Sequence, residues 1–191
     1  MRLPIQFQTH TALAKGLREL LNQLQNCIQL DETVTVFLAG GMAVHLYTGS
    51  RATTDVDAEF SKRIFLPADL VVEVKHDDGT TEPLYFDTNY NSSFALMHED
   101  YTRDSVSLDI GVPNIALRVL APVDLVVSKI ARFADNDKED IAELVSLGLT
   151  SSDDIERRAM AALVGFVGGK GMLLLNLQDT LALVREIERR G

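Results

Sequence analysis

The chain has 191 residues, of which 46% are hydrophobic and 24% charged, and its formal net charge is −10. This length is typical of one domain, or of one core with a small appendage, and the composition excludes a disordered or collagen-like chain. The single cysteine, Cys27, excludes an internal disulfide and a cysteine-rich zinc site. The acidic balance argues against a general binder of the nucleic-acid backbone.

Neither a targeting segment nor a membrane span is expected. The sequence has no basic segment followed by an apolar stretch, and no apolar run approaches the roughly 18 residues that cross a membrane. We therefore expect a cytoplasmic protein with no membrane partner.

The first part of the chain alternates between helix and strand signals. Apolar residues recur at helical spacing over residues 11–29, and β-branched residues predict a strand at Val34–Leu38. The further elements predicted in this part are a short helix at Met42–Tyr47, a strand at Asp55–Phe60, a hairpin of Val71–Lys75 and Leu84–Phe86, and strands at Phe94–Met97 and Ser105–Ile110.

After Pro113 the pattern changes to helices, with a capping box at Ser151 and Asp154. The predicted helices run from Pro122 to about Phe133, over Asp137–Leu147, over 152–164 and over 173–189. The fold class expected is α+β, with a mixed β-sheet core and flanking helices over residues 1–120. A small C-terminal helical region over residues 121–191 would pack on that core.

A Gly-Gly turn, Gly40-Gly41, joins the strand at Val34–Leu38 to the following helix. The N-terminus of a helix offers unpaired N–H groups, and glycine lets the backbone approach an anion closely. Such turns are also common for purely structural reasons. By itself this turn therefore indicates a phosphate site only weakly.

Three carboxylates have the pattern of a metal site. Asp55 and Asp57 flank Val56 on a predicted strand, so that alternation places both acids on one face. Asp109 shares the face of its own predicted strand with Ser107. A divalent cation would offset the repulsion between such acids, and oxygen ligands suit Mg²⁺. The alternative is that they are ordinary solvated acids.

Taken together, these motifs resemble those of a known superfamily. Phe37-Leu38-Ala39-Gly40-Gly41, a short helix and then Asp55-Val56-Asp57-Ala58 are similar to the signature of the DNA polymerase β-type nucleotidyltransferases. The longer string through Gly49-Ser50-Arg51-Ala52-Thr53-Thr54 resembles a bacterial branch of minimal nucleotidyltransferases. That branch includes enzymes similar to abortive-infection (AbiEii-like) toxins and to resistance enzymes that modify small molecules.

The resemblance implies roles for these residues. Gly40 and Gly41 would hold the phosphates of a nucleoside triphosphate. Asp55 and Asp57 would bind two Mg²⁺ ions, with Mn²⁺ as an alternative. Asp109 would match the third acid, bridging the catalytic ion and helping to activate an acceptor hydroxyl. One departure is Met42, which stands where many members have a serine that helps to hold the triphosphate.

The resemblance extends to residues outside the acidic motif. Arg51 matches an arginine that closes the loop over the site or pairs with an acid. Lys129 and Arg132, three residues apart on a predicted helix, would contact the nucleotide, and Asp137 and Asp140 would order the residues around them. Two alternatives without a functional role stay open. Arg51 can be a surface arginine, and the charged residues of the later helices can form a solvated helix face.

The expected function is therefore a Mg²⁺-dependent transfer of a nucleoside monophosphate from a triphosphate, such as ATP, to an acceptor hydroxyl. The branch resemblance favours RNA or a tRNA end as acceptor, in a toxin–antitoxin or phage-defence setting with a cognate antitoxin as partner. The alternatives are a small-molecule acceptor of the antibiotic type, or a non-catalytic nucleotide-binding module, which Met42 would permit.

Overall fold

The computed structural model describes residues 5–28 and 32–191. Within them the chain forms a mixed α+β fold that divides into two compact units. The first unit comprises the described residues of Met1–Tyr90 together with Ser105–Val119. The second comprises Asn91–Asp104 and Leu120–Gly191. The α+β class expected from the sequence is confirmed.

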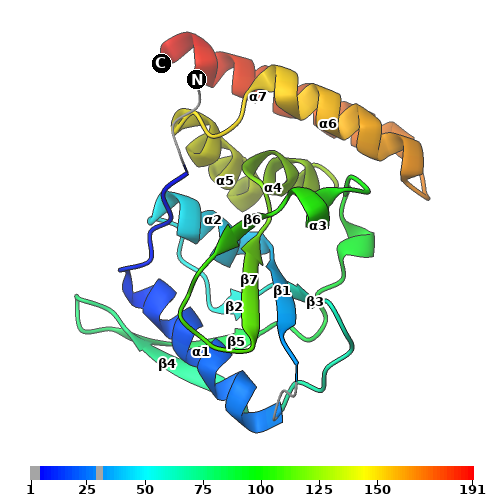
Figure 1. The fold of residues 1–191 in the computed structure, drawn as a ribbon. Coiled ribbons are helices and arrows are strands. Elements are labelled where there is room, and N and C mark those ends of the chain that lie inside the picture. The colour runs from blue at the N-terminus through cyan, green and yellow to red at the C-terminus, as the bar shows by residue number, and fades with distance from the viewer. Residues whose placement is uncertain (1–4, 29–31) are drawn as a thin grey trace. The chain divides into compact units, whose positions relative to one another are not determined.

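The first unit contains a four-stranded sheet in the order β3-β1-β7-β6 (Figure 1). Strand β1 (Val34–Leu38) pairs in parallel with β7 (Ile115–Val119) and antiparallel with β3 (Ala58–Phe60). The short strand β6 (Val106–Leu108) is antiparallel to β7. In both central strands every second side chain is buried, which is the pattern expected of a sheet with a packed face.

A second, three-stranded sheet in the same unit has the order β2-β5-β4. Strand β2 (Asp55–Val56) runs parallel to β5 (Thr81–Phe86), which forms a hairpin with β4 (Val71–Lys75). The hairpin prediction is confirmed. The prediction of one strand over Asp55–Phe60 is wrong, because the chain leaves the second sheet at Asp57 and joins the first sheet as β3.

Two helices pack in the first unit. Helix α1 (Ala12–Ile28) confirms the predicted helix, whose residue 29 lies outside the described residues. It packs on β4, where a Cβ at Gly16 would come within 2.5 Å of Val74 Cγ2. Helix α2 (Gly40–Thr48) begins at the Gly-Gly pair, two residues earlier than predicted. Along the described chain no helix is long and apolar enough to cross a bilayer.

The second unit is helical, as the sequence predicted for its larger part. Ser151 caps α6, and its side chain accepts a hydrogen bond from the Asp154 backbone N–H, which confirms the predicted cap. The predicted strand at Phe94–Met97 is wrong, since a 3-10 turn, η1, occupies Ser92–Phe94 instead. The helices are α3 (Tyr101–Asp104), α4 (Pro122–Lys129), α5 (Asp135–Ser146), α6 (Ser152–Gly165) and α7 (Lys170–Arg190).

Candidate functional site

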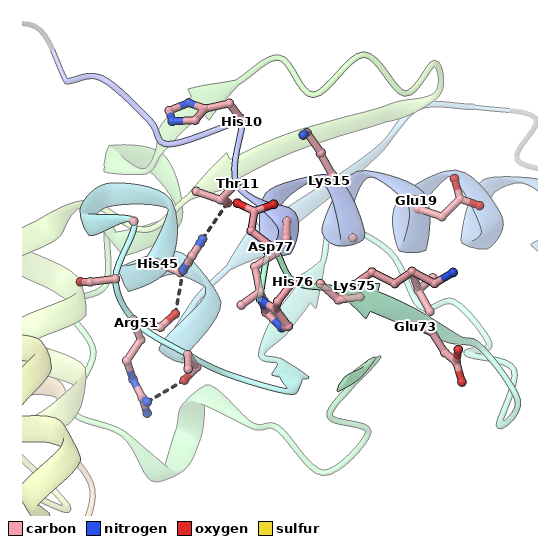
Figure 2. A pocket seen from close by; sticks show the side chains of 18 residues that line it. His10, Thr11, Lys15, Glu19, His45, Arg51, Glu73, Lys75, His76 and Asp77 are labelled. Atoms are coloured by element: carbon pink, nitrogen blue, oxygen red, sulfur yellow. Dashed lines mark hydrogen bonds between the residues drawn. The ribbon is translucent and has the colours of Figure 1, made fainter. Parts of the chain in front are cut away.

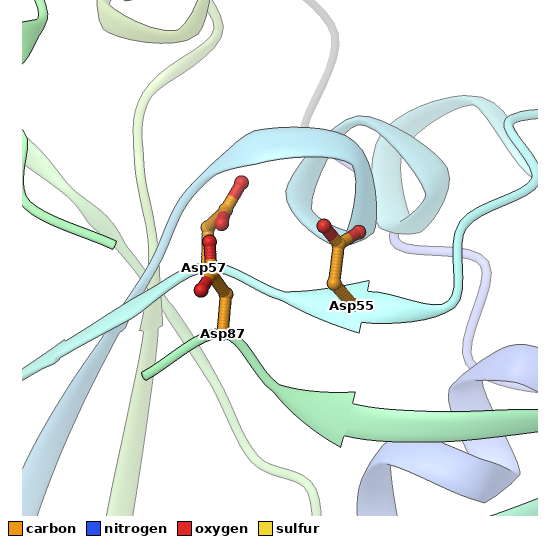
Figure 3. Close-up of side chains that lie close together, drawn as sticks. All are labelled: Asp55, Asp57 and Asp87. Carbon is orange, nitrogen blue, oxygen red and sulfur yellow. The ribbon is translucent and has the colours of Figure 1, made fainter. Parts of the chain in front are cut away.

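Three carboxylates, those of Asp55, Asp57 and Asp87, converge in the first unit (Figure 3). One oxygen of each lies within 4.8 Å of an oxygen of the other two. The parallel pairing of β2 with β5 accounts for this geometry: Val56 is in register with Phe86, so the next residue of each chain segment, an aspartate, lies beside the other. The Asp87 backbone N–H donates to the Val56 carbonyl over 3.1 Å.

The chemistry of this cluster fits a divalent cation. The Thr53 hydroxyl donates to Asp55 Oδ1 over 2.7 Å, and the Asn89 backbone N–H donates to Asp87 Oδ1 over 2.8 Å. These bonds orient the carboxylates but do not cancel their charge. Like charges at this separation repel one another, and a cation bound between them would offset that repulsion. A set of hard oxygen donors is what Mg²⁺ or Mn²⁺ prefers.

The Gly-Gly turn lies directly against these acids. The Ala39 backbone N–H donates to the Asp57 carbonyl over 2.8 Å. Gly40 has a φ of +59°, and a Cβ there would lie 1.8 Å from Asp57 Oδ2. A Cβ at Gly41 would come within 3.1 Å of Thr53 Oγ1. The structure thus brings Gly40 and Gly41 together with Asp55 and Asp57, while their assignment to phosphate and metal stays a prediction.

Met42, at the position where the family resemblance implies a serine, is fully buried in the core of the first unit. Its side chain is therefore shielded from solvent. Any contact that the turn makes with phosphate would come from backbone N–H groups at the start of α2, which the positive end of the helix dipole favours.

Asp109, the third acid predicted from the sequence, is not in the carboxylate cluster that the described residues form. It directly follows β6, and its Oδ1 accepts a hydrogen bond from the Gly111 backbone N–H over 2.9 Å. Sequence reasoning missed Asp87. The signal available for it was an aspartate immediately after the apolar strand Leu84–Phe86, but its place depends on a long-range strand pairing.

Arg51 lines a different cavity of the first unit, of about 690 Å³, between α1, β4 and the loop after α2 (Figure 2). Its guanidinium Nη1 donates to the Ala52 carbonyl over 2.7 Å. His45 anchors this loop, because its Nδ1 donates to the Arg51 carbonyl over 2.7 Å while Nε2 accepts from the Thr11 hydroxyl over 2.8 Å. Burial lowers the pKa of His45, and the bond to Arg51 opposes that effect only in part.

The remaining predicted residues form an ion cluster within the second unit. Lys129 Nζ lies 2.7 Å from Asp140 Oδ2 and 3.5 Å from Asp137 Oδ1, and all three side chains are buried. Arg132 follows the end of α4 and binds both oxygens of Asp137. Burial would raise the pKa of Asp137, but hydrogen bonds from Arg132 and the Ala134 backbone, with the Lys129 charge, hold it below its usual value. Contact of Lys129 and Arg132 with a nucleotide stays a prediction.

Comparison with known families identifies the chain more closely. Residues 15–167 match a family described as nucleotidyltransferase of unknown function (DUF6036). The chain belongs to this family. The matched range includes the Gly-Gly turn and all three clustered acids. No curated protein matches the chain.

Among solved structures, the chain is similar to an antigenic nucleotidyltransferase-like protein from Paracoccidioides brasiliensis. The identity is 14%, the match covers 93% of this chain and 89% of the other, and the TM-score is 0.40. The family description does not mention abortive-infection toxins, and membership of that branch stays a prediction.

Proposed function

We propose that this protein transfers a nucleoside monophosphate from a nucleoside triphosphate to an acceptor hydroxyl, with divalent metal bound at Asp55, Asp57 and Asp87. The observation that carries the proposal is the contact between the Gly-Gly turn and this carboxylate cluster. Backbone N–H groups suited to phosphate and oxygen ligands suited to Mg²⁺ lie side by side. Membership of a nucleotidyltransferase family supports the same reaction class.

The Gly-Gly turn and the carboxylate cluster would have different roles in this reaction. The N–H groups at the start of α2 hold phosphate oxygens of the triphosphate, and the three carboxylates hold the metal. Bound Mg²⁺ supplies charge neutralisation and lowers the pKa of a hydroxyl. The acceptor oxygen forms a bond to the α-phosphorus, the bond from that phosphorus to the pyrophosphate oxygen breaks, and pyrophosphate leaves. A carboxylate oxygen of Asp87 accepts the hydroxyl proton, in place of Asp109, for which the family resemblance implies help in activating this hydroxyl.

The proposal has two versions, which differ in the acceptor that receives the nucleoside monophosphate. The sequence resemblance favours an RNA or tRNA end, with a cognate antitoxin as partner, and keeps a small molecule as the alternative. A net charge of −10 opposes the approach of a polyanion. Transfer to RNA would therefore require a local basic face, and a small acceptor would not.

Label transfer tests the proposal directly. Each α-labelled nucleoside triphosphate is incubated with the protein and Mg²⁺, once with total RNA and once with a pool of small alcohols. We expect label on one acceptor class and release of pyrophosphate. The variant Asp57→Asn should lose this activity, and Asp135→Asn, which changes an aspartate with a 96% exposed side chain in the other unit, should keep it.

Two results would contradict the proposal. Undiminished transfer by Asp57→Asn would remove the cluster from the reaction. Tight binding of triphosphate without release of pyrophosphate in any acceptor pool would indicate the non-catalytic binding module, which Met42 would permit.

A further inference from the structure

A second cavity of the first unit, of about 280 Å³, shares Asp87 with the carboxylate cluster. Its other walls come from the segment before β4, from the first residue of β4, from the end of β5 and from the segment after β5. They include Leu66, Pro67, Leu70, Val71, Tyr85 and Asn89. Asp87 therefore borders both the carboxylate cluster and this cavity, which we call the Tyr85 pocket.

Backbone hydrogen bonds place the cluster between the Gly-Gly turn and the Tyr85 pocket. On one side, Asp57 accepts a backbone hydrogen bond from Ala39, directly before the turn. On the other side, Asp87 donates a backbone hydrogen bond to Val56. Beyond β5 lies β4, whose Val71 is in register with Tyr85. The order across the unit is thus the turn, Asp57, Asp87 and then the pocket.

This order matches the direction of the proposed reaction. In phosphoryl transfer the attacking and leaving oxygens lie roughly in line on opposite sides of the phosphorus. The turn would hold the phosphates that leave. The acceptor must then approach from the side of Asp87, which is a lining residue of the Tyr85 pocket.

The lining of the pocket indicates what kind of acceptor it takes. Val71 is 44% and Tyr85 40% exposed, so that apolar surface beside the acids is accessible to solvent. The pocket residues, all within the described chain, include no lysine, arginine or histidine, and Asp87 is their one charged member. Exposed aromatic and apolar surface binds a ring well, whereas a phosphate backbone needs cations. The volume is near the lower limit for small-molecule sites, about 300–1,000 Å³.

We propose that the Tyr85 pocket is the acceptor subsite and that it takes a small, uncharged, ring-containing alcohol of about the size of a free nucleoside. The ring lies on Tyr85 and Val71, Asn89 supplies a hydrogen-bonding amide, and the hydroxyl faces Asp87. This inference rests on the proposed function, since it assigns the second substrate of the same site.

A binding experiment tests the pocket without requiring turnover. The probe is a mixture of the four ribonucleosides, observed by NMR with the full-length protein and Mn²⁺. Mn²⁺ at the carboxylates broadens the resonances of a molecule held close to it. We expect broadening with the wild type, its loss in Ala68→Trp, which fills the pocket from an exposed wall position, and its retention in Phe94→Ala. Phe94, an 81% exposed ring of the second unit, is the matched control for a surface aromatic.

Kinetics supply the second measurement. Tyr85→Ala should raise the KM for the nucleoside about tenfold, as is typical for the loss of one apolar contact surface in a pocket, with the KM for the triphosphate within about twofold of wild type. Equal changes in both constants would indicate a general structural defect and would overturn the inference.

The remaining outcomes separate the two proposals. Binding of Mn²⁺ without broadening of any nucleoside overturns the acceptor subsite. Label that goes only to RNA, and is unchanged in Ala68→Trp, also overturns it and leaves nucleotidyl transfer standing. Failure to bind Mn²⁺ and failure to release pyrophosphate together refute the proposed function itself.

Discussion

The two units use carboxylates in opposite ways. In the second unit, Asp124, Asp137 and Asp140 are buried, and each accepts hydrogen bonds from the cationic head of a lysine or arginine. In the first unit, Asp55, Asp57 and Asp87 gather within 4.8 Å of one another. One arrangement neutralises negative charge within the chain, and the other concentrates it.

This difference separates structural acids from candidate functional ones. Arg158 binds both oxygens of Asp124, and burial of the guanidinium is outweighed by Asp124 and Asp104, which raise the pKa of Arg158. Such a group is already satisfied and has little to offer a ligand. In the cluster at Asp87 three carboxylates lie together, and a bound cation would offset the repulsion between their charges. The comparison therefore favours the first unit as the place of metal chemistry.

The largest expected effect comes from testing which acid completes the cluster. Asp87→Asn should lower the rate of nucleotidyl transfer by about 10²–10³-fold, the loss typical when one electrostatic contact to the transition state is removed. Asp109→Asn changes the acid that the sequence predicted and is the matched control. Its rate of nucleotidyl transfer should stay within about twofold of the wild-type rate. Steady-state rates and titration of Mn²⁺ by electron paramagnetic resonance measure both. If Asp109→Asn is the inactive variant, the geometric assignment of Asp87 is wrong.

A second prediction tests the structural role of the acids in the other unit. Lys129→Met should lower the free energy of unfolding by about 3–5 kcal/mol, because it removes the buried cation that lies 2.7 Å from the buried carboxylate of Asp140 and 3.5 Å from that of Asp137. Arg132→Ala should cost less, about 1 kcal/mol, since the Arg132 side chain is 66% exposed and solvent screens its pairing with Asp137. Urea denaturation followed by circular dichroism measures both. Equal losses would show that Lys129 is not the principal cation of this cluster.

The sequence predicted those parts of the site that depend on local structure. A strand end, a Gly-Gly pair and the start of a helix are contiguous, so the turn at Gly40 followed from residues beside it. Asp55 and Asp57 followed from a short motif. Asp87 did not, because it reaches the cluster through the parallel pairing of β2 with β5, segments about 30 residues apart in sequence. No local pattern determines such a pairing.

Long-range pairing also explains the errors. The alternation around Asp109 correctly indicated a short strand, but that strand pairs with β7, and Asp109 follows its end. The segment from Asp55 to Phe60 has the pattern of one strand, yet hydrogen bonds to two different sheets divide it at Asp57. In each case the local propensity was compatible with the structure, and the choice of partner strand decided the outcome.

A third prediction concerns the close contact between the turn and the acids. Gly40→Ala should destabilise the first unit by about 2 kcal/mol or more, since it combines a positive φ with overlap at Asp57. Gly79→Ala is the matched control: its φ is +85°, but no atom lies within 4 Å of the added Cβ, so only the backbone cost of about 1 kcal/mol is expected. Thermal unfolding of both variants measures the difference. Equal losses would show that the turn does not lie against Asp57.

The smallest expected effect is the contribution of His45 to the pH dependence of the free energy of unfolding. Burial lowers its pKa in the folded protein below the value of about 6.5 that applies when the chain is unfolded. Between these two values the unfolded chain binds a proton that the folded protein does not, so stability falls as the pH decreases through about 6.5. Protonation would also remove the acceptor that Nε2 offers to the Thr11 hydroxyl, while the Nδ1–H bond to the Arg51 carbonyl would persist.

Urea denaturation between pH 8 and pH 5 measures this effect. We expect the wild type to lose stability below pH 6.5 that His45→Gln does not lose, and the two proteins to show the same slope above pH 7. A wild-type slope of the opposite sign below pH 6.5 would mean that the folded protein favours the charged imidazole. Arg51 would then not be held by a neutral His45. Because the loop carrying Arg51 and Thr53 precedes the first acid of the cluster, the same pH range should show whether this anchor also affects binding of Mn²⁺.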